Sequence, residues 1–375
     1  MEISSKKLLN ELSSNGISRS LLSLADLIRK QKVGNYVYFR GLIEISNVCQ
    51  KNCYYCGLRK DNKNVKRYTL TEEEVVELAL LIYKKGIRSL ALQSGEIKNE
   101  AFFEKLLRII RKIKEETKKI DIQNGEEPKG AGITGSFGEL EKEHYEELFK
   151  AGVHRYLLRI ETSNRELYEK LHPSDHSFEK RLKCLKWLKE IGYQVGTGVI
   201  IGIPGQTYED LVNDLLFFKD FDIDMIGMGP YIEHRDTPIF RWYEDLITYN
   251  GFYKKVFELS IKMIAFARIL LEDVNIVAST ALQSVPGCEN ALELGIKAGA
   301  NVVMPVFTPY SARKNYRIYE GKKNLTPEEM SQRIKKAGYE PVWDRWGDPL
   351  HFFKRNKMSN SFLCNFVNFS SMKNS

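Results

Sequence analysis

The sequence is poor in the features that mark membrane, secreted and disulfide-stabilised proteins. No stretch reaches the roughly 18 apolar residues of a membrane helix, and the apolar stretch Met263–Leu271 is interrupted by Arg268. The first residues, MEISSKKLLNELSS, lack the apolar core and the small-residue cleavage site of a secretory signal. Six cysteines among 375 residues are too few for a disulfide scaffold. We therefore expect a cytoplasmic protein without a membrane partner.

The composition is not that of a disordered or nucleic-acid-binding protein either. Hydrophobic residues make up 43% and charged residues 28% of the chain, so a sizeable core can form and disorder is excluded. The 57 Lys and Arg outnumber the 49 Asp and Glu, and the resulting charge of +8 is spread along the chain. Such a distribution favours a solvated basic surface over a nucleic-acid groove. We expect an enzyme-sized chain without a nucleic-acid partner.

From residue 37 onward, strand-like runs alternate with helical runs, which is the pattern of a parallel α/β fold. One helix is expected over 71–85, because Thr71 and Glu74 have the spacing of a capping box. Eight strand candidates favour a (β/α)8 barrel of the TIM type, with a doubly wound open sheet as the alternative. In such a barrel, chemistry lies at the C-terminal ends of the strands. The strands are expected at 37–45, 89–93, 132–136, 155–161, 194–201, 224–232, 275–280 and 301–306.

The segments on either side of these strands have different patterns. We expect residues 1–36 to form an N-terminal helical cover of a barrel that spans 37–306. Residues 307–355 show no clear periodicity and are interpreted as a closing segment of the barrel. The Asn- and Ser-rich stretch 356–375 predicts a flexible tail. Glycines and charges within 118–135 suggest an inserted loop.

One loop is loaded with cysteine. In SNVCQKNCYYCGLR, three and then two residues separate Cys49, Cys53 and Cys56. Thiolates that lie this close in one loop can bind a single iron–sulfur cluster. Three ligands leave one iron of a four-iron cluster open to a small chelating molecule. A zinc site, which requires a fourth Cys or His at pair spacing, and inert thiols are the alternatives. The remaining cysteines stand alone in the sequence: Cys184, Cys288 and Cys364.

This cysteine spacing, with Tyr55 before the third cysteine, resembles the signature of radical S-adenosylmethionine (SAM) enzymes. The stretches IEISNVCQKNCYYCGLRKDNKNVKRY, RYLLRIETSN and AGANVVMP extend the resemblance over about residues 20–350, to the HydE family of FeFe-hydrogenase maturases. The resemblance implies one 4Fe–4S cluster that reductively cleaves SAM to a 5′-deoxyadenosyl radical, and a role in assembly of the di-iron subcluster of the H-cluster. Methylornithine synthase and biotin synthase are related alternatives. A non-catalytic iron–sulfur sensor is a third.

The resemblance also assigns SAM contacts. The segment 94–96 is expected to hold the amino group, Glu161 the ribose, Arg181 the carboxylate and Met225 the adenine. The alternatives are a structural ion pair for Glu161, ordinary helix surface for Arg181 and plain core for Met225. The glycine-rich GIPGQT stretch is interpreted as a strand-to-helix turn with Thr207 as N-cap. The expected cofactor-binding residues are Tyr55, Ser94, Gly95, Glu96, Glu161, Arg181 and Met225.

Polar residues that point into the barrel are expected to bind the substrate. Arg155 and Arg159 point to one face of a strand, because side-chain direction repeats every two residues. Buried cations require anionic partners, so they imply an anionic small molecule or iron complex, or a structural pair with Glu161. The resemblance suggests a ferredoxin- or flavodoxin-type electron donor, and other hydrogenase maturases, as partners. The expected substrate contacts are Thr134, Ser136, Arg155, Arg159, Ser279, Thr280, Tyr316 and Tyr319.

A second, auxiliary cluster is not expected. Some HydE proteins bind such a cluster through cysteines of the C-terminal closing segment, and the matching stretch here, RIYEGKKNLTPEEM, contains none. Cys184 and Cys288 are expected to be buried thiols. His234, the single histidine of IEHRDTP, is interpreted as a structural residue.

Overall fold

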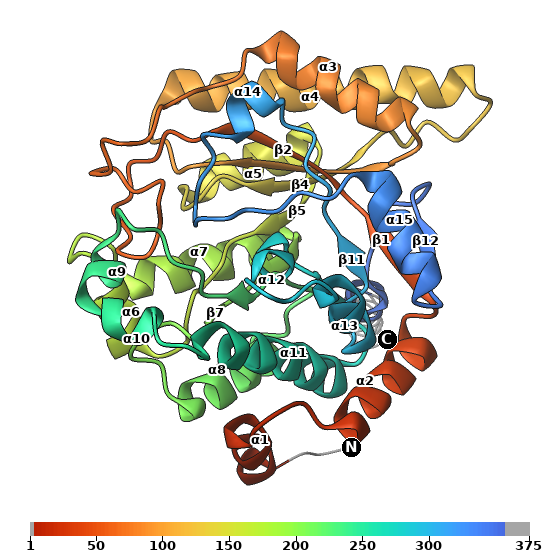
Figure 1. Cartoon of the computed structure of the whole chain (residues 1–375). Coiled ribbons are helices and arrows are strands. Elements are labelled where there is room, and N and C mark those ends of the chain that lie inside the picture. The colour runs from red at the N-terminus through yellow and green to blue at the C-terminus, as the bar shows by residue number, and fades with distance from the viewer. Residues whose placement is uncertain (1–3, 357–375) are drawn as a thin grey trace, which may run out of the picture.

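The structure, a computed structural model, describes residues 4–356 and is built around a curved parallel sheet (Figure 1). The strands are β1 Tyr36–Phe39, β2 Gly41–Ser46, β3 Ser89–Ser94, β4 Gly132–Ser136, β5 Val153–Leu157, β6 Gln194–Thr197, β7 Ile200–Ile201, β8 Met225–Ile226, β9 Gly229–Pro230, β10 Asn275–Ile276, β11 Val302–Val303 and β12 Glu340–Val342. The main sheet has the order β2-β3-β4-β5-β6-β8-β10, and all of its neighbours pair in parallel. Consecutive strands therefore lie side by side, as expected for the (β/α)8 type.

The segment around β11 joins the two edges of this sheet. Val302 forms a parallel bridge to Val277, which follows β10. The same residue pairs with Tyr38 of β1. Further along, the Leu42 N–H of β2 donates to the Pro305 carbonyl at 2.9 Å. The ring of strands is thus closed by backbone hydrogen bonds, and the alternative of a doubly wound open sheet is wrong.

Helices surround the sheet on its outer face (Figure 1). The capping box expected for Thr71 and Glu74 is present at the start of α3, and a second one joins Thr207 to Asp210 at the start of α8. Helix starts are thus fixed by short-range side-chain bonds to the backbone. The helices are α1 Ser5–Ser13, α2 Arg19–Lys32, α3 Glu72–Lys84, α4 Glu100–Gln123, α5 Lys142–Ala151, α6 Arg165–Leu171, α7 Phe178–Ile191, α8 Tyr208–Asp220, α9 Pro238–Trp242, α10 Glu244–Ile247, α11 Phe252–Leu271, α12 Thr280–Ser284, α13 Ala291–Lys297, α14 Tyr310–Arg313 and α15 Pro327–Lys336.

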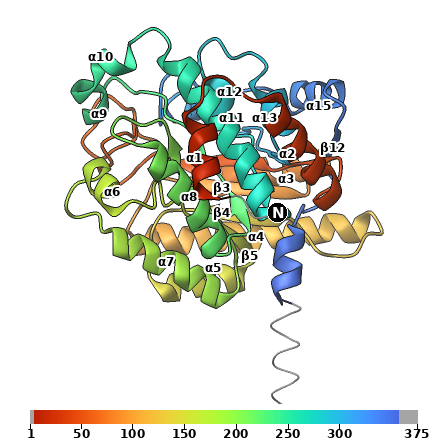
Figure 2. The ribbon, with the colours of Figure 1, turned by 90° about the horizontal axis from the view of Figure 1, so that it is seen from below.

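The N-terminal helices cover one side of the barrel. Helices α1 and α2 pack against α8 and α11 (Figure 2). The buried Lys262 of α11 donates its Nζ protons to the carbonyls of Glu11 and Ser14, at 2.8 and 2.6 Å. Carbonyls at the end of a helix have no partner within the helix, so this lysine satisfies the end of α1. Among the described helices, none combines the length and the hydropathy that a membrane span requires.

Two expectations about local structure need correction. The stretch 118–135 is not an inserted loop, because α4 continues to Gln123 and β4 starts at Gly132. In the last turns of the helix, Asp121 is buried and accepts hydrogen bonds from Tyr83 Oη and Gly130 N, while Lys118 and Lys119 are exposed. The closing segment contains regular structure, since α15 carries a capping box and β12 pairs with β1. The expected tail lies, apart from its first residue, outside the described residues.

Candidate active site

A cavity of ≈ 260 Å³ lies at the C-terminal ends of the barrel strands, against the loop that carries the cysteines. This is the edge where the fold predicts chemistry. The structure therefore gathers the three cysteines, most of the expected SAM contacts and part of the expected substrate contacts. The expected site residues that line the cavity are Cys49, Cys53, Tyr55, Cys56, Ser94, Gly95, Glu96, Ser136, Arg159, Glu161, Arg181, Tyr316 and Tyr319.

The end of β3 determines where the cysteine loop lies. A Cβ on Gly95 would come within 2.2 Å of the Val48 carbonyl oxygen and 2.8 Å of Cys49 Cβ, so only glycine permits this approach. The Gln50 N–H then donates to the Glu96 carbonyl at 2.8 Å. The loop is therefore bound to the strand end on both sides of its first cysteine.

Burial controls the protonation of the thiols. It raises the pKa values of Cys49 and Cys53, and it raises the pKa of Cys56 to about 12. Each thiol therefore carries its proton at neutral pH until a metal displaces it. Three soft sulfur donors on one short loop suit an iron–sulfur cluster. Cys184, by contrast, is buried in α7 and donates to the Leu140 carbonyl at 3.6 Å.

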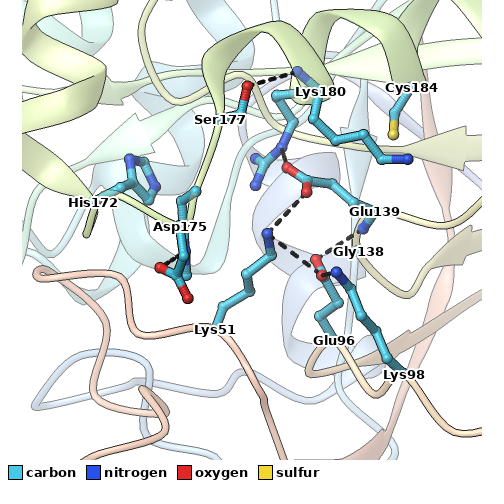
Figure 3. A network of polar contacts seen from close by, with 12 residues as sticks. Lys51, Glu96, Lys98, Gly138, Glu139, His172, Asp175, Ser177, Lys180 and Cys184 are labelled. Atoms are coloured by element: carbon cyan, nitrogen blue, oxygen red, sulfur yellow. Dashed lines mark hydrogen bonds and ion pairs between the residues drawn. The ribbon is translucent and has the colours of Figure 1, made fainter.

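Four charged side chains form a buried network beside the cysteine loop (Figure 3). Lys51 Nζ lies 2.8 Å from Glu139 Oε2 and 3.6 Å from Glu96 Oε1. Arg181 Nε donates to Glu139 Oε1 at 2.6 Å, and the backbone N–H of Glu139 donates to Glu96 Oε2 at 2.9 Å. Burial by itself raises the pKa of Glu139, but Arg181 and Lys51 outweigh it and hold that pKa at about 2. The network connects the cysteine loop to Glu96 and Arg181, two of the residues expected to bind SAM.

Sequence reasoning missed Lys51 and Glu139. Lys51 stands between the first two cysteines, where any residue satisfies the cluster spacing. Glu139 follows β4 in an irregular segment without a motif. The feature that marks Glu139 is its burial. Burial depends on contacts between distant parts of the chain, which the sequence does not show.

Glu161 has a strained backbone. Its φ of 69° lies in the left-handed region, which is uncommon for residues other than glycine and clusters at functional sites. Its N–H donates to the Gly198 carbonyl at 3.0 Å, which ties it to the next strand. Asp214 of α8 accepts from both the N–H and the Oγ of Ser163, at 2.6 and 2.7 Å, and so fixes the following turn. Arg159 Nη2 lies 3.0 Å from Glu161 Oε2, so the ion pair considered as an alternative is present beside the cavity.

Arg181 is not ordinary helix surface. It is 7% exposed, and its Nη1 donates to the Arg159 carbonyl while its Nε binds Glu139. No described residue accepts a hydrogen bond from its Nη2. One edge of the guanidinium is therefore held by the protein, and a donor remains for a ligand in the cavity that it lines.

Two histidines of the loop between α6 and α7 support the cysteine loop from the other side. Tyr55 Oη lies 3.3 Å from His172 Nε2, and the rings meet edge to face at 5.4 Å. Burial lowers the pKa of His172 to about 3, so this imidazole is neutral. His176 Nε2 accepts from the Asn52 N–H at 3.0 Å. The sequence offered no motif for either histidine.

Two expected substrate contacts lie at the opposite end of the barrel and need correction. Arg155 is fully buried and donates to Thr134 Oγ1 at 3.1 Å, Ser89 Oγ at 2.8 Å and Asp348 Oδ1 at 2.8 Å. Arg159 lies beyond the end of β5 at Leu157 and lines the cavity, whereas Arg155 lies within the strand and does not. Arg155 and Thr134 therefore belong to a structural network that includes the C-terminal segment.

Three further expected residues do not line the cavity. Met225 accepts a hydrogen bond on Sδ from Arg40 Nη1 at 3.0 Å, inside the barrel and away from the cysteines, which fits the core alternative. Ser279 caps α12 by accepting from the Leu282 N–H at 3.3 Å, and Thr280 is the first residue of that helix. Ser279 therefore has a capping role, and Thr280 lies one residue before Ala281, which lines the cavity.

The interpretation of GIPGQT as a turn is confirmed. Gln206 Oε1 accepts from the Gly202 N–H at 2.7 Å, so GIPGQT satisfies its own backbone as a turn, and Thr207 caps α8. His234 packs its ring against Gly57, where an added Cβ would come within 2.3 Å of the ring.

The comparisons with known proteins agree with this geometry. The sequence model of the Radical SAM superfamily matches residues 43–218. The [FeFe] hydrogenase maturase subunit HydE of Thermotoga maritima is 46% identical over 312 residues, which cover 83% of this chain and 82% of that protein. The chain belongs to the radical SAM superfamily and, within it, to the HydE family.

More distant radical SAM enzymes share the architecture. A 3-methylornithine synthase of Methanosarcina acetivorans is 25% identical over 328 residues, or 86% of this chain and 85% of that one. The crystal structure of a methylornithine synthase has a TM-score of 0.72 at 23% identity and covers 91% of this chain and 94% of its own. At that identity the likeness establishes the shared fold.

As a radical SAM enzyme, the protein uses a 4Fe–4S cluster and SAM, and its cavity fits both. Three thiols face it from one loop. Two buried carboxylate oxygens that border it, Glu96 Oε1 and Glu161 Oε2, accept no hydrogen bond from a described residue, although Lys51 and Arg159 lie within ion-pair distance of them. Both oxygens therefore keep hydrogen-bond acceptor capacity for the donors of a bound ligand.

Proposed function

We propose that this radical SAM enzyme acts in assembly of the di-iron subcluster of the FeFe-hydrogenase H-cluster. The observation that carries the proposal is the 46% identity to the HydE maturase subunit across 83% of the chain. A methylornithine-type or biotin-synthase-type reaction has less support, because those relatives are 25% and 29% identical. A non-catalytic sensor has less support still, since the cavity contains more polar groups than three thiolate ligands require.

In this proposal the three cysteines bind the cluster and the cavity walls bind SAM. When bound, the cluster and SAM supply a 5′-deoxyadenosyl radical for hydrogen abstraction or addition. Glu96 accepts from the SAM amino group, and Glu161 accepts from the ribose hydroxyls through two carboxylate oxygens. Arg181 donates a hydrogen bond from Nη2 to the SAM carboxylate, while the hydrogen bond from its Nε to Glu139 keeps the guanidinium in place. Binding of both groups in the cavity would exclude water from the reacting atoms.

The part of the cavity wall that is not assigned to SAM suits an anionic small molecule or iron complex as substrate. Arg159 lines this wall, and its Nε has no hydrogen-bond partner among the described residues. Ser136, Tyr316 and Tyr319 add hydroxyl groups that can bind ligands of such a complex. Arg155 and Thr134 have no part in substrate binding in this proposal, because their polar groups bind to each other and Arg155 also binds Asp348.

The remaining parts of the proposal concern the setting of the reaction. We expect an acidic electron donor of the ferredoxin or flavodoxin type, and cooperation with other hydrogenase maturases. A single cluster is expected, because the closing segment contains no cysteine over 317–330. A cytoplasmic location suits thiol ligands, which must stay reduced.

Complementation tests the proposal. The protein is produced in a host that contains the other maturases and an FeFe hydrogenase but no HydE protein of its own. We expect hydrogenase activity with the wild-type chain and none with Cys53→Ala. If the cluster-loaded wild-type protein yields no active hydrogenase, or converts lysine to methylornithine, the proposal is wrong.

A further inference from the structure

Two strongly basic segments adjoin the cysteine loop. Residues 59–67, RKDNKNVKR, directly follow it and contain five cationic residues and one acidic residue. Residues 313–322, RKNYRIYEGK, contain four cationic residues and one acidic residue. Part of the net charge of +8 is therefore concentrated in these two segments.

Backbone and side-chain hydrogen bonds bring the two segments together. Asn47 Nδ2 donates to the Lys66 carbonyl at 2.9 Å and to the Asn315 carbonyl at 2.8 Å. The Gly57 N–H, one residue after the third cysteine, donates to the Ile318 carbonyl at 2.7 Å. Figure 1 shows the same arrangement, with α14 and the chain after it beside the loop that follows β2. The two segments thus form one surface over the cysteines.

One side chain holds the first of these segments, residues 59–67, in place. Arg67 directs its guanidinium inward and donates to the carbonyls of Asn47, Leu58, Arg59 and Asn62, at 2.7 to 3.2 Å. A loop held by one side chain at four backbone positions loses little entropy when a partner binds. The backbone positions from which the exposed cations of this segment extend are therefore fixed.

Arg59 pairs with Asp61 and Lys322 pairs with Glu44, but most of the other cations on this surface have no anionic partner among the described residues. We define the basic face by six residues: Lys60, Lys63, Lys66, Arg313, Lys314 and Arg317. None of them forms an ion pair with a described residue. On α4, by contrast, Lys112 pairs with Glu116 and Lys119 with Glu115. A pocket of ≈ 520 Å³ lies against Arg313, Lys314 and Arg317.

The enzyme needs one electron from outside to start its reaction, and electron transfer weakens steeply with distance. The hydrogen bond from Gly57 to Ile318 is a short route from Cys56 to the basic face, since Arg317 is the neighbouring residue. A carrier that docks here would thus come close to the cluster ligands. Opposite charges on the two proteins speed such encounters.

We propose that the basic face is the docking surface for an acidic protein that carries one electron. This inference rests on the proposed function, because it names the binding surface for the expected donor. On docking, the carrier is oxidised by one electron and the enzyme is reduced by one, and no bond or proton changes place. The unpaired cations provide the charge complementarity, and the electron passes to the cluster that the adjacent cysteine loop would hold.

The double variant Lys63→Glu/Lys314→Glu tests the inference in the reconstituted holoenzyme. Both residues are exposed and neither lines the active-site cavity. The control, Lys118→Glu/Lys297→Glu, makes the same charge change at exposed positions of α4 and α13. An acidic flavodoxin serves as probe, and its Kd is measured by titration calorimetry. Stopped-flow absorbance compares reduction by that flavodoxin with reduction by photoreduced deazaflavin, a small neutral reductant.

We expect the double variant to raise the Kd and to slow reduction by flavodoxin about tenfold at low ionic strength. The difference should shrink at about 1 M salt, where the Debye length is about 3 Å. Reduction by deazaflavin should be unchanged. An unchanged Kd, an equal effect of the control, or an equal slowing with deazaflavin would each overturn the inference. None of these measurements uses the maturation substrate, so failure of the complementation test would leave their outcome interpretable.

Discussion

Lys51→Met removes the cation that lies between two buried carboxylates. Glu96 and Glu139 are 4% and 3% exposed, and Lys51 Nζ approaches both. Without it, Glu139 retains Arg181, while Glu96 retains only Lys98 at 3.9 Å. The backbone N–H of Glu139 donates to the Glu96 carboxylate, so the two glutamates lie close together. Without Lys51, the nearby cations no longer offset their two buried negative charges. We expect this change to disturb the SAM-binding wall more than the cluster.

The size of the effect follows from the burial of the partners. Removing one member of a buried ion pair costs about 3–5 kcal/mol. Because Arg181 remains, we expect a loss of about 2–3 kcal/mol in the free energy of unfolding. The pKa of Glu139, about 2, lies below its ordinary 4.5. The stability from this group is therefore present above pH 4.5 and is lost as the pH falls toward 2.

Urea unfolding of the holoenzyme and equilibrium binding of SAM measure the two consequences. Lys51→Met should bind SAM about tenfold more weakly and retain its iron, whereas Lys51→Arg should preserve both properties because it keeps the charge. The difference in unfolding free energy between wild type and Lys51→Met should narrow below pH 4.5. Equal stability and equal SAM affinity in the two variants would refute the reasoning.

Other substitutions test other parts of the structure. Gly95→Ala should lower the iron and sulfide content after reconstitution, since an added Cβ meets the Val48 carbonyl at 2.2 Å; full content would contradict this. Asp348→Asn should destabilise the fold by about 3 kcal/mol, because it leaves a buried arginine unpaired, yet leave 5′-deoxyadenosine release per cluster unchanged. A lower rate of 5′-deoxyadenosine release per cluster would contradict the assignment of Arg155 and Asp348 to a purely structural network. Hydrogen bonds to Asp222 and Asp273 raise the pKa of His351 to about 9. Its stabilising effect is present below pH 6.5 and lost as the pH rises through 9, so the difference in Tm between wild type and His351→Ala should shrink over that range; a constant difference would refute it.

Much of the fold was predictable because its signals are local. Thr71 and Glu74 predict a helix start from four consecutive positions, and the capping box is present. The alternation of strands and helices predicts the barrel, and the strands lie side by side in chain order. The three cysteines are equally local, since one loop contains all of them. Such features depend little on the rest of the chain.

What the sequence could not predict depends on long-range contacts. The alternation of side chains along a strand predicts that Arg155 and Arg159 point the same way, but not at which level of the barrel each one lies. Asp348, a partner of Arg155, lies far along the chain. Glu139 acquires its role only where Lys51 and Arg181 meet it. The left-handed backbone of Glu161 likewise has no sequence signal, because a glutamate is usually found elsewhere in φ/ψ space.

The measurement that tests the central claim most directly is the EPR spectrum of the reconstituted, reduced protein with and without SAM. We predict a four-iron signal that SAM shifts, with release of 5′-deoxyadenosine, and no such signal in Cys53→Ala. Glu161→Gln should keep the four-iron signal but require a much higher SAM concentration for the shift. A wild-type signal that SAM leaves unchanged, or a Glu161→Gln variant with wild-type SAM affinity, would contradict the site described above.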